Sequence, residues 1–371
     1  MGVSDGVTDG NLHALKLIWF AALLAMFSSS FVLADSDTSP FKAVPADELR
    51  DLALHQQWLH LLHYRQHPYT FRFISQNDSP EFFLAEKGKT NAHEELVADL
   101  SAFLLTDQAD NASAQCRFPA RYHWLKHRLP QVGFVDQPCS EFDEWRDELN
   151  AHRLTLIFPA SHINSPSSMY GHTLVRMDRE DQSSSKLLAY SVNFAANADP
   201  TDNELVFSYK GLSGGYPGEV SVMPYYVKTN QYQHMEYRDT WEYELDFGSA
   251  EVDQFVRHVW ELQDTAFDYF FFDENCSYRL LTMLDAASSR SDLAADFKMK
   301  AVPVDTIRAL YSAGFVSREV YRPSAASVME SNAALASEEE ADLARTLVES
   351  DIPIGDLLAG VPEESQTRVL E

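Results

Sequence analysis

The sequence predicts an α+β protein in which a helical N-terminal part packs on an antiparallel sheet. Apolar residues recur at three- and four-residue steps through much of residues 35–150, which is typical of amphipathic helices. Short segments rich in β-branched and aromatic residues then follow from 154 to 247, and helical spacing returns after 249. Runs of helices followed by runs of strands indicate an α+β arrangement, and 45% hydrophobic content is enough for a substantial core.

The elements that we expect follow the chain in order. The N-terminal helices are ADELRDLALHQQWLHLLHY, AHEELVADLSAFLL and SEFDEWRDELN. The strands are LTLIF, TLVRM (beginning at Gly171), LLAYSVNF, ELVFSYK, EVSVMPYYV and TWEYELDF. SAEVDQFVRHVWELQDT is a strong helix that begins at Ser249, because its apolar residues lie along one face. The aromatic run FDYFFF is either a short strand or the wall of a cleft.

The N-terminus has the features of an export signal. Lys16 precedes the apolar run LIWFAALLAMF, and Val32 and Ala34 are the small residues that precede a signal-peptidase cut. The run is shorter than the roughly 20 apolar residues of a spanning helix. We therefore expect cleavage after Ala34 and a periplasmic protein, with an uncleaved membrane anchor as the alternative.

The charge of the chain limits its possible partners, and changes in composition along it indicate its segments. The net charge of −27 argues against a nucleic-acid partner and against electrostatic docking on anionic lipid head groups. We expect a signal peptide at 1–34, a helical part at 35–150, a catalytic part at 151–322 and an acidic helical tail at 323–371. The tail contains the acidic amphipathic segment ALASEEEADLARTLV and stops abruptly at VLE, which suggests a fragment of a longer protein.

The three cysteines have different surroundings. Cys116 and Cys139 lie in loop-like, proline-containing sequence, and an oxidising compartment favours a disulfide between them. Such a bridge closes a loop of about 24 residues and is worth about 3 kcal/mol in the chain-entropy model. Cys276 is left over, either as a reactive thiol or as an inert buried one.

The position of Cys276 favours reactivity. Leu280, Leu281 and Leu284 predict a helix that begins near Cys276, and Asn275 is a residue type that caps helices. A thiol on the first turn faces unpaired amides and the positive end of the helix dipole, which stabilise the thiolate. The same amides could stabilise an oxyanion, with the Asn275 side chain as a further candidate.

His172 is the candidate base. It follows Gly171 at the start of a predicted strand, where a side chain can be aimed rigidly, whereas a structural histidine bonded to the loop is the alternative. His162 in the preceding loop is the rival base. On the next strand, Asn193 and Ser191 share one face, and either could bond the outer ring nitrogen and fix its tautomer, with Asn193 as the first choice and Ser191 as the second. We expect His172 within hydrogen-bond reach of the sulfur, an open cleft above the thiol and His162 at its rim.

The remaining histidines give no strong metal motif. His123 and His127 have i, i+4 spacing but no accompanying third ligand or glutamate. His55, His60 and His63 have the spacing of ordinary helix residues, and His234 and His258 have no neighbours that suggest catalysis. We therefore expect no metal and no cofactor.

Several of these blocks together resemble a known family. SMYGHTLVRMD, GLSGGYPGEVSVMPYYVK, YRDTWEYEL and FFFDENCSYRLLTML, with upstream blocks such as LHQQWLHLLHY, resemble the periplasmic domain of Lnb-type lipoprotein N-acyltransferases. More distantly, a strand histidine followed by Asn-Cys at a helix start is similar to the permuted papain-like fold of lecithin:retinol acyltransferase-like enzymes. The resemblance implies cysteine-dependent acyl transfer, with Cys276 matching the family's cysteine and His172 its histidine.

The sequence therefore predicts an exported thiol acyltransferase that passes through an acyl-thioester. The resemblance implies a phospholipid acyl donor at a membrane surface, with a lipoprotein amine or water as acceptor. In the family, membrane helices follow the periplasmic domain, and none is found here after residue 287. This difference argues against a lipoprotein substrate more than against acyl transfer itself. The alternatives are a cysteine amidase or peptidase of the cell envelope and a periplasmic binding module without catalysis.

Overall fold

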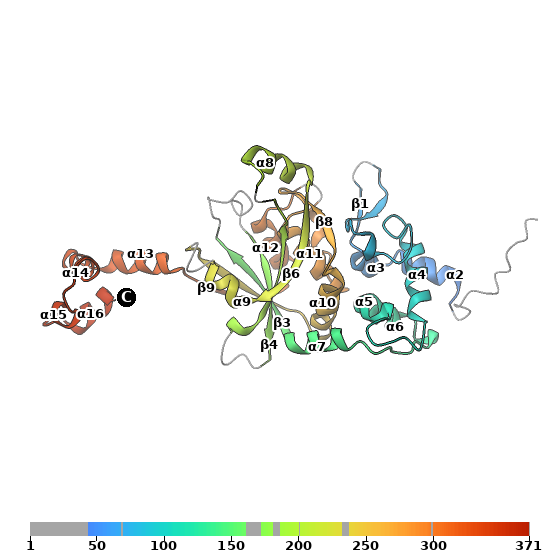
Figure 1. Cartoon of the computed structure of the whole chain (residues 1–371), viewed down its shortest axis with the longest axis horizontal. Helices are drawn as coiled ribbons and strands as arrows, with labels where there is room; N and C mark the ends of the chain where they lie inside the picture. Colours follow the sequence, from blue (N-terminus) through green and yellow to red (C-terminus); the bar gives the residue numbers. More distant parts are fainter. Residues whose placement is uncertain are drawn as a thin grey trace, which may run out of the picture. The chain divides into compact units, whose positions relative to one another are not determined.

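The main structural element is a mixed α+β unit built on an antiparallel sheet (Figure 1). The computed structural model describes residues 44–67, 70–160, 172–180, 186–199, 201–231, 237–297 and 300–370. In this part of the chain the large sheet has the order β8-β6-β5-β4-β3-β7-β9, with every neighbouring pair antiparallel. Its strands are β3 (Ala151–Pro159), β4 (Leu174–Arg179), β5 (Tyr190–Ala196), β6 (Tyr216–Pro224), β7 (Thr240–Leu245), β8 (Ala266–Tyr269) and β9 (Val316–Arg322). The predicted fold class is confirmed.

Helix α11 (Cys276–Ala287) lies at the centre of the packing. It contacts β4 and β5 on one side and α3 (Gln56–Leu61), α10 (Ser249–Leu262) and α12 (Pro303–Ser312) on others (Figure 1). Every residue of α11 is buried, which is the condition of a helix enclosed on all sides. The cysteine at its first position is therefore held by a rigid element.

The N-terminal region is helical, as predicted, and joins the sheet unit through α3 and α6. The predicted helix ADELRDLALHQQWLHLLHY is divided, because the chain breaks at Leu54 and His55 caps the second helix by accepting from the Gln57 amide. The other elements of this region are α2 (Ala46–Ala53), β1 (Tyr64–Gln66), β2 (Phe73–Ser75), α4 (Ala92–Phe103), α5 (Ala114–Arg117), α6 (Pro119–Arg128) and α7 (Ser140–Leu149).

A disulfide and a buried group of ion pairs hold this region together. The disulfide between Cys116 and Cys139 is present, with Cα atoms 5.1 Å apart, which confirms the predicted pairing. Arg121 is fully buried and pairs with Glu95 at 3.0 Å and Asp99 at 3.5 Å. A buried cation needs such partners, because the desolvation of an unpaired charge is strongly unfavourable.

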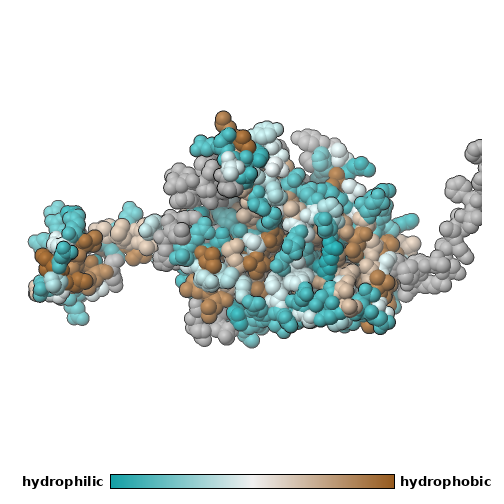
Figure 2. Space-filling view, in the orientation of Figure 1, coloured by the Kyte–Doolittle hydropathy of each residue, from teal (hydrophilic) through white to brown (hydrophobic). Residues whose placement is uncertain are grey.

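The segment ELVFSYK was predicted as a strand and is instead helix α8 (Glu204–Ser213). Asn203 caps the helix by accepting from two first-turn amides, and Gly214 ends it in the left-handed conformation at φ 74°. Figure 2 shows hydrophobic residues at the outer edge of this helix. The strand prediction failed because Leu205, Phe207 and Tyr209 alternate with polar or smaller residues, and that alternation is compatible with either element.

Other predicted boundaries shift by a few residues. β4 begins at Leu174, so His172 precedes the strand, and Gly171 lies outside the described residues. EVSVMPYYV ends its strand at Pro224 and continues as α9 (Tyr225–Thr229). LLAYSVNF begins in a 3-10 turn at Lys186–Leu188, and α10 is capped by Gly248. FDYFFF includes the end of β8.

The C-terminal segment forms further helices, including the predicted acidic one. α14 (Glu338–Glu349) starts with a capping box between Ser337 and Glu340, and Arg368 bonds Glu340 at 2.7 Å. The remaining elements are α13 (Ala325–Leu335), α15 (Ile354–Leu357), α16 (Glu363–Leu370) and the 3-10 turns Pro80–Phe82, Pro130–Val132 and Leu293–Asp296. Among the described residues, none of the helices combines the length and the hydropathy needed to cross a bilayer. The predicted signal peptide lies outside these residues.

Candidate active site

Cys276 is the first residue of α11, and Asn275 fixes that helix start. The Asn275 Oδ1 atom accepts from the amides of Ser277 and Tyr278 at 3.1 and 3.3 Å. Its Nδ2 atom donates to the carbonyls of Phe271 at 3.1 Å and Ala301 at 2.6 Å. Because these bonds engage both ends of the side-chain amide, Asn275 acts in this structure as a cap. It does not act as the free oxyanion donor that was one expectation from the sequence.

The structure brings His172 and Cys276 together across 104 positions of the chain. The Nδ1 atom of His172 lies 3.1 Å from the sulfur of Cys276, within the reach expected from the sequence. The Nε2 atom lies 2.6 Å from Oδ1 of Asn193 on β5. An amide oxygen only accepts, so Nε2 carries the proton, and Nδ1 is left to exchange a proton with the thiol. Ser191, the second choice for this contact, instead donates to the carbonyl of Met223.

The electrostatics favour an ion pair between the two side chains. Burial tends to raise the pKa of Cys276, but the adjacent His172, the Thr173 amide and the Ser277 hydroxyl lower that pKa from 9.0 to about 7. Burial tends to lower the pKa of His172, but the charge of Cys276 and the hydrogen bonds of Cys276 and Asn193 raise it above 6.5. A thiolate and an imidazolium are therefore stabilised together near neutral pH.

Two contacts of Cys276 were missed by the sequence reasoning. The amide N–H of Thr173 is directed at the sulfur, and the Thr173 hydroxyl lies 2.9 Å from that of Ser277. The phenol oxygen of Tyr269, at the end of β8, lies against the amide N–H and the sulfur of Cys276, and burial raises the pKa of this phenol well above 10.0. The aromatic run before Cys276 was the signal in the sequence, but it does not indicate which ring turns toward the thiol.

The thiol is enclosed in the described part of the chain. Cys276 is only 2% exposed, so the expected open cleft is not found there. The phenol oxygen of Tyr269 and the amide of Thr173 both lie against Cys276 at this helix start. His162, the rival base, lies outside the described residues.

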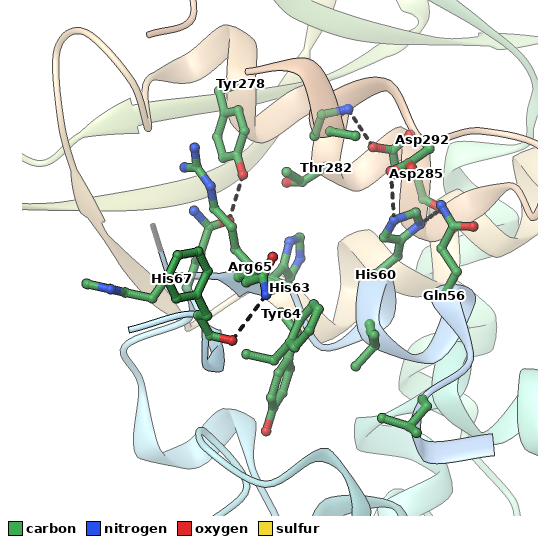
Figure 3. Close-up of a pocket in the computed structure, with 18 residues that line it drawn as sticks. Gln56, His60, His63, Tyr64, Arg65, His67, Tyr278, Thr282, Asp285 and Asp292 are labelled. Atoms are coloured by element: carbon green, nitrogen blue, oxygen red, sulfur yellow. Dashed lines mark hydrogen bonds and ion pairs between the residues drawn. The ribbon is translucent and has the colours of Figure 1, made fainter. Parts of the chain in front are cut away.

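A separate cavity of about 580 Å³ lies between α3, the β1–β2 hairpin and the side of α11 that carries Tyr278, Thr282 and Asp285 (Figure 3). His63 lines it and is buried, with Nε2 lying 2.9 Å from Nε2 of His258. His258 in turn lies 3.2 Å from Glu261. Burial, followed by the neighbouring His258, lowers the pKa of His63 well below 6.5, so its imidazole stays neutral. These histidines form part of the buried polar contacts between the turn that follows α3 and helix α10.

One group beside this cavity has ligand types that could hold a cation. His60, Asp285 and Asp292 place ligand atoms within 4.8 Å of one another. His60 pairs with Asp292 at 3.4 Å, and its Nδ1 lies 3.2 Å from the Asp285 carbonyl (Figure 3). The Asp285 carboxylate accepts from the amides of Leu293 and Ala294 at 2.7 and 2.9 Å. An ion pair and a cap of the following 3-10 turn account for this group. His123 and His127 are used in bonds to Gln254 and to the His123 carbonyl.

Comparison with known families agrees with the resemblance noted in the sequence. Residues 141–313 match the family model described as the Lnb N-terminal periplasmic domain, and this segment contains both Cys276 and His172. Residues 50–128 match a model described as a domain of unknown function (DUF7843). The comparisons found no matching curated protein and no matching solved structure. The resemblance to the Lnb periplasmic-domain family is confirmed, and it supports a periplasmic location in the cell envelope.

Proposed function

We propose that this protein is a thiol acyltransferase of the bacterial periplasm, with Cys276 as nucleophile and His172 as general base and acid. The observation that carries the proposal is the 3.1 Å contact between the Cys276 sulfur and the His172 ring, with Asn193 on the other ring nitrogen. A nucleophile, a base and a residue that orients the base form the general arrangement for covalent catalysis. We also propose that the core is a permuted papain-like arrangement, since the histidine precedes the cysteine along the chain.

In the first half-reaction, the Cys276 sulfur attacks the carbonyl carbon of an acyl ester. The bond between that carbon and the leaving oxygen breaks, and the imidazolium of His172 gives its Nδ1 proton to the departing alcohol. The acyl group is then held on sulfur as a thioester. Asn193 keeps the imidazole oriented throughout, because its Oδ1 accepts from Nε2–H in either charge state.

The negative charge on the substrate oxygen needs donors beside the sulfur. The amide N–H of Cys276 is on the first turn of α11, and at present it faces the phenol oxygen of Tyr269. A substrate oxygen that enters between them could accept from both the amide and the phenol hydroxyl. Such donors are typically worth a factor of 10² to 10³ in rate.

In the second half-reaction, an amine or water attacks the thioester carbon. His172 removes a proton from the attacking nitrogen or oxygen, the carbon–sulfur bond breaks, and the thiolate of Cys276 is restored. With an amine the product is an amide, and with water it is a free acid. A phospholipid as donor and a lipoprotein amine as acceptor are proposed from the family resemblance. A phospholipid donor is consistent with a location in the envelope.

The proposal is tested by the release of lysophospholipid from phosphatidylethanolamine vesicles, with and without a lipopeptide that has a free N-terminal amine. We expect the wild-type protein to release lysophospholipid and to acylate the lipopeptide, and Cys276→Ala and His172→Gln to do neither. Asn193→Ala should retain a small fraction of the rate. Ser191→Ala is the matched control, because Ser191 lies near Asn193 on β5 but donates its hydroxyl to the Met223 carbonyl, whereas Asn193 bonds the imidazole. Release that depends on Cys276 but transfers only to water would indicate a hydrolase, and equal release by the Cys276→Ala variant would refute the proposal.

A further inference from the structure

Helix α8 carries a stripe of exposed apolar side chains, which we call the α8 stripe. Leu205, Tyr209 and Leu212 are 84%, 72% and 54% exposed, and their i, i+4, i+7 spacing puts them on one face of the helix. In Figure 2, hydrophobic residues stand out at the edge of α8. Single exposed leucines are ordinary, but three large apolar residues aligned on one helix indicate a surface that meets an apolar partner.

The opposite side of α8 already fixes the helix on the molecule. The ring of Phe207 lies 5.3 Å from that of Phe271 and 5.7 Å from that of Tyr216, measured between ring centroids. Gly211 fits directly against the Phe271 ring, where a Cβ atom would lie only 2.1 Å from the nearest ring carbon. The α8 stripe is therefore the solvent-facing side of a helix whose opposite side is already packed.

The same contacts connect α8 to the proposed catalytic thiol. The amide of Phe271 donates to the carbonyl of Gly211 at 2.9 Å, and the carbonyl of Phe271 accepts from Asn275 at 3.1 Å. Asn275 is the cap of the helix on which Cys276 stands. A surface that binds α8 is therefore connected to Cys276 through Gly211, Phe271 and Asn275.

Charge indicates which apolar surface the stripe fits. Lys210, the cation within α8, is bound to Asp202 at 2.7 Å, and Glu204 adds a negative charge in the first turn. The whole chain carries a net charge of −27. Attraction to anionic head groups is therefore absent, and binding would have to come from insertion of apolar side chains into a neutral or zwitterionic interface.

We propose that the α8 stripe inserts into the interface of a zwitterionic phospholipid bilayer and holds the Cys276 site at the membrane surface. This inference rests on the proposed function, since it provides the way in which the thiol reaches an acyl ester in lipid. Leu205 and Leu212 enter the acyl boundary, and Tyr209 lies at the head-group level, where amphipathic rings are favoured.

The test uses Cys276→Ala protein purified from the periplasm, in which no catalysis takes place and Cys116 and Cys139 are bridged. Leu205→Cys in this background gives one reactive thiol on the stripe, and an environment-sensitive fluorophore is attached there. Leu335→Cys, at a position that is 73% exposed on α13, is the matched control. On addition of phosphatidylcholine vesicles, we expect a blue-shifted and stronger emission from the label at 205 and no change from the label at 335.

A second measurement follows co-flotation with the same vesicles. Combined Leu205→Ser and Leu212→Ser substitutions should reduce the partition coefficient by at least about tenfold, because burying one leucine is worth about that factor or more. Anionic lipid should not strengthen binding. The proposal is overturned if the label at 205 does not respond, or if the serine variant floats like its parent. It is also overturned if the substitutions change only self-association in sedimentation, since the partner is then a second copy.

These results are separable from those on the proposed function. If the stripe binds vesicles but Cys276 never transfers an acyl group, docking stands and the acyltransferase proposal fails. If short-chain soluble phospholipids are cleaved but vesicle binding does not depend on the stripe, the catalytic proposal stands and docking fails.

Discussion

Replacement of His172 by glutamine should change the acidity of Cys276 by a large and measurable amount. In the wild-type structure the pKa of Cys276 is about 7, although burial, the largest influence, raises it. Without the imidazole, burial is opposed by the weaker hydrogen bonds that remain at the sulfur, among them those of the Thr173 amide and the Ser277 hydroxyl. We therefore expect a pKa at or above 9, a shift of about two units, equivalent to about 2.7 kcal/mol.

The consequence for reactivity depends on pH. At pH 6 the thiolate fraction should fall from about one tenth to about one thousandth, while the more basic thiolate is up to about tenfold more nucleophilic. The net rate of alkylation should thus fall by about tenfold at pH 6 and recover above pH 9.

The assay measures iodoacetamide alkylation by intact mass between pH 5 and 10. Cys276 is the free cysteine in the structure, because Cys116 and Cys139 form a disulfide, so one mass increment reports it alone. Ser191→Ala serves as the control and should keep the wild-type midpoint. An unchanged midpoint in the His172→Gln variant would refute the coupling between the thiol and the imidazole.

Three further outcomes are expected. Tyr269→Phe should lower the rate of acyl transfer by a factor of about 10² but change Cys276 alkylation much less, since the phenol, although it lies against the sulfur, acts mainly on the oxyanion; an equal loss in both assays would contradict this role. Burial tends to raise the pKa of Glu242, but Arg176 lowers it to about 2. The ionised carboxylate therefore stabilises the fold at pH values above 4.5, its ordinary pKa, and this stability is lost as the pH falls toward 2. Glu242→Gln should flatten that acid limb in urea denaturation, and an unaltered limb would argue against it. Arg121→Met should cost about 3–5 kcal/mol in the same measurement, because buried carboxylates lose their counter-ion, and a loss below 1 kcal/mol would disprove this.

The sequence predicted the helix start at Cys276 well, because local chemistry determines a helix start. Asn275 is a capping residue and the leucines after Cys276 have helical spacing, so this element followed from neighbouring residues alone. The pairing of His172 with Cys276 joins distant positions, and only their residue types and the family resemblance suggested it. Asn193 was named because it shares a strand face with Ser191, but its choice over Ser191 depends on geometry that the pattern does not contain.

What the sequence did not predict depends on tertiary contacts. The sequence of α8 predicts a strand because its alternating apolar pattern is compatible with both periods, whereas the Asn203 cap and the packing of Gly211 on Phe271 determine the helix. Tyr269 and Thr173 approach the thiol through sheet register and through the backbone before β4, and neither is visible from spacing.

The most direct test of the proposed chemistry is to detect the acyl group on Cys276 itself. The protein is incubated with phosphatidylethanolamine of defined acyl chains, quenched in acid and analysed by intact mass and peptide mapping. We expect a mass increment equal to one acyl chain on the peptide containing Cys276, removed by neutral hydroxylamine and absent from His172→Gln. A protein that iodoacetamide still alkylates at Cys276 but that never carries this hydroxylamine-labile acyl group would contradict the acyl-thioester mechanism.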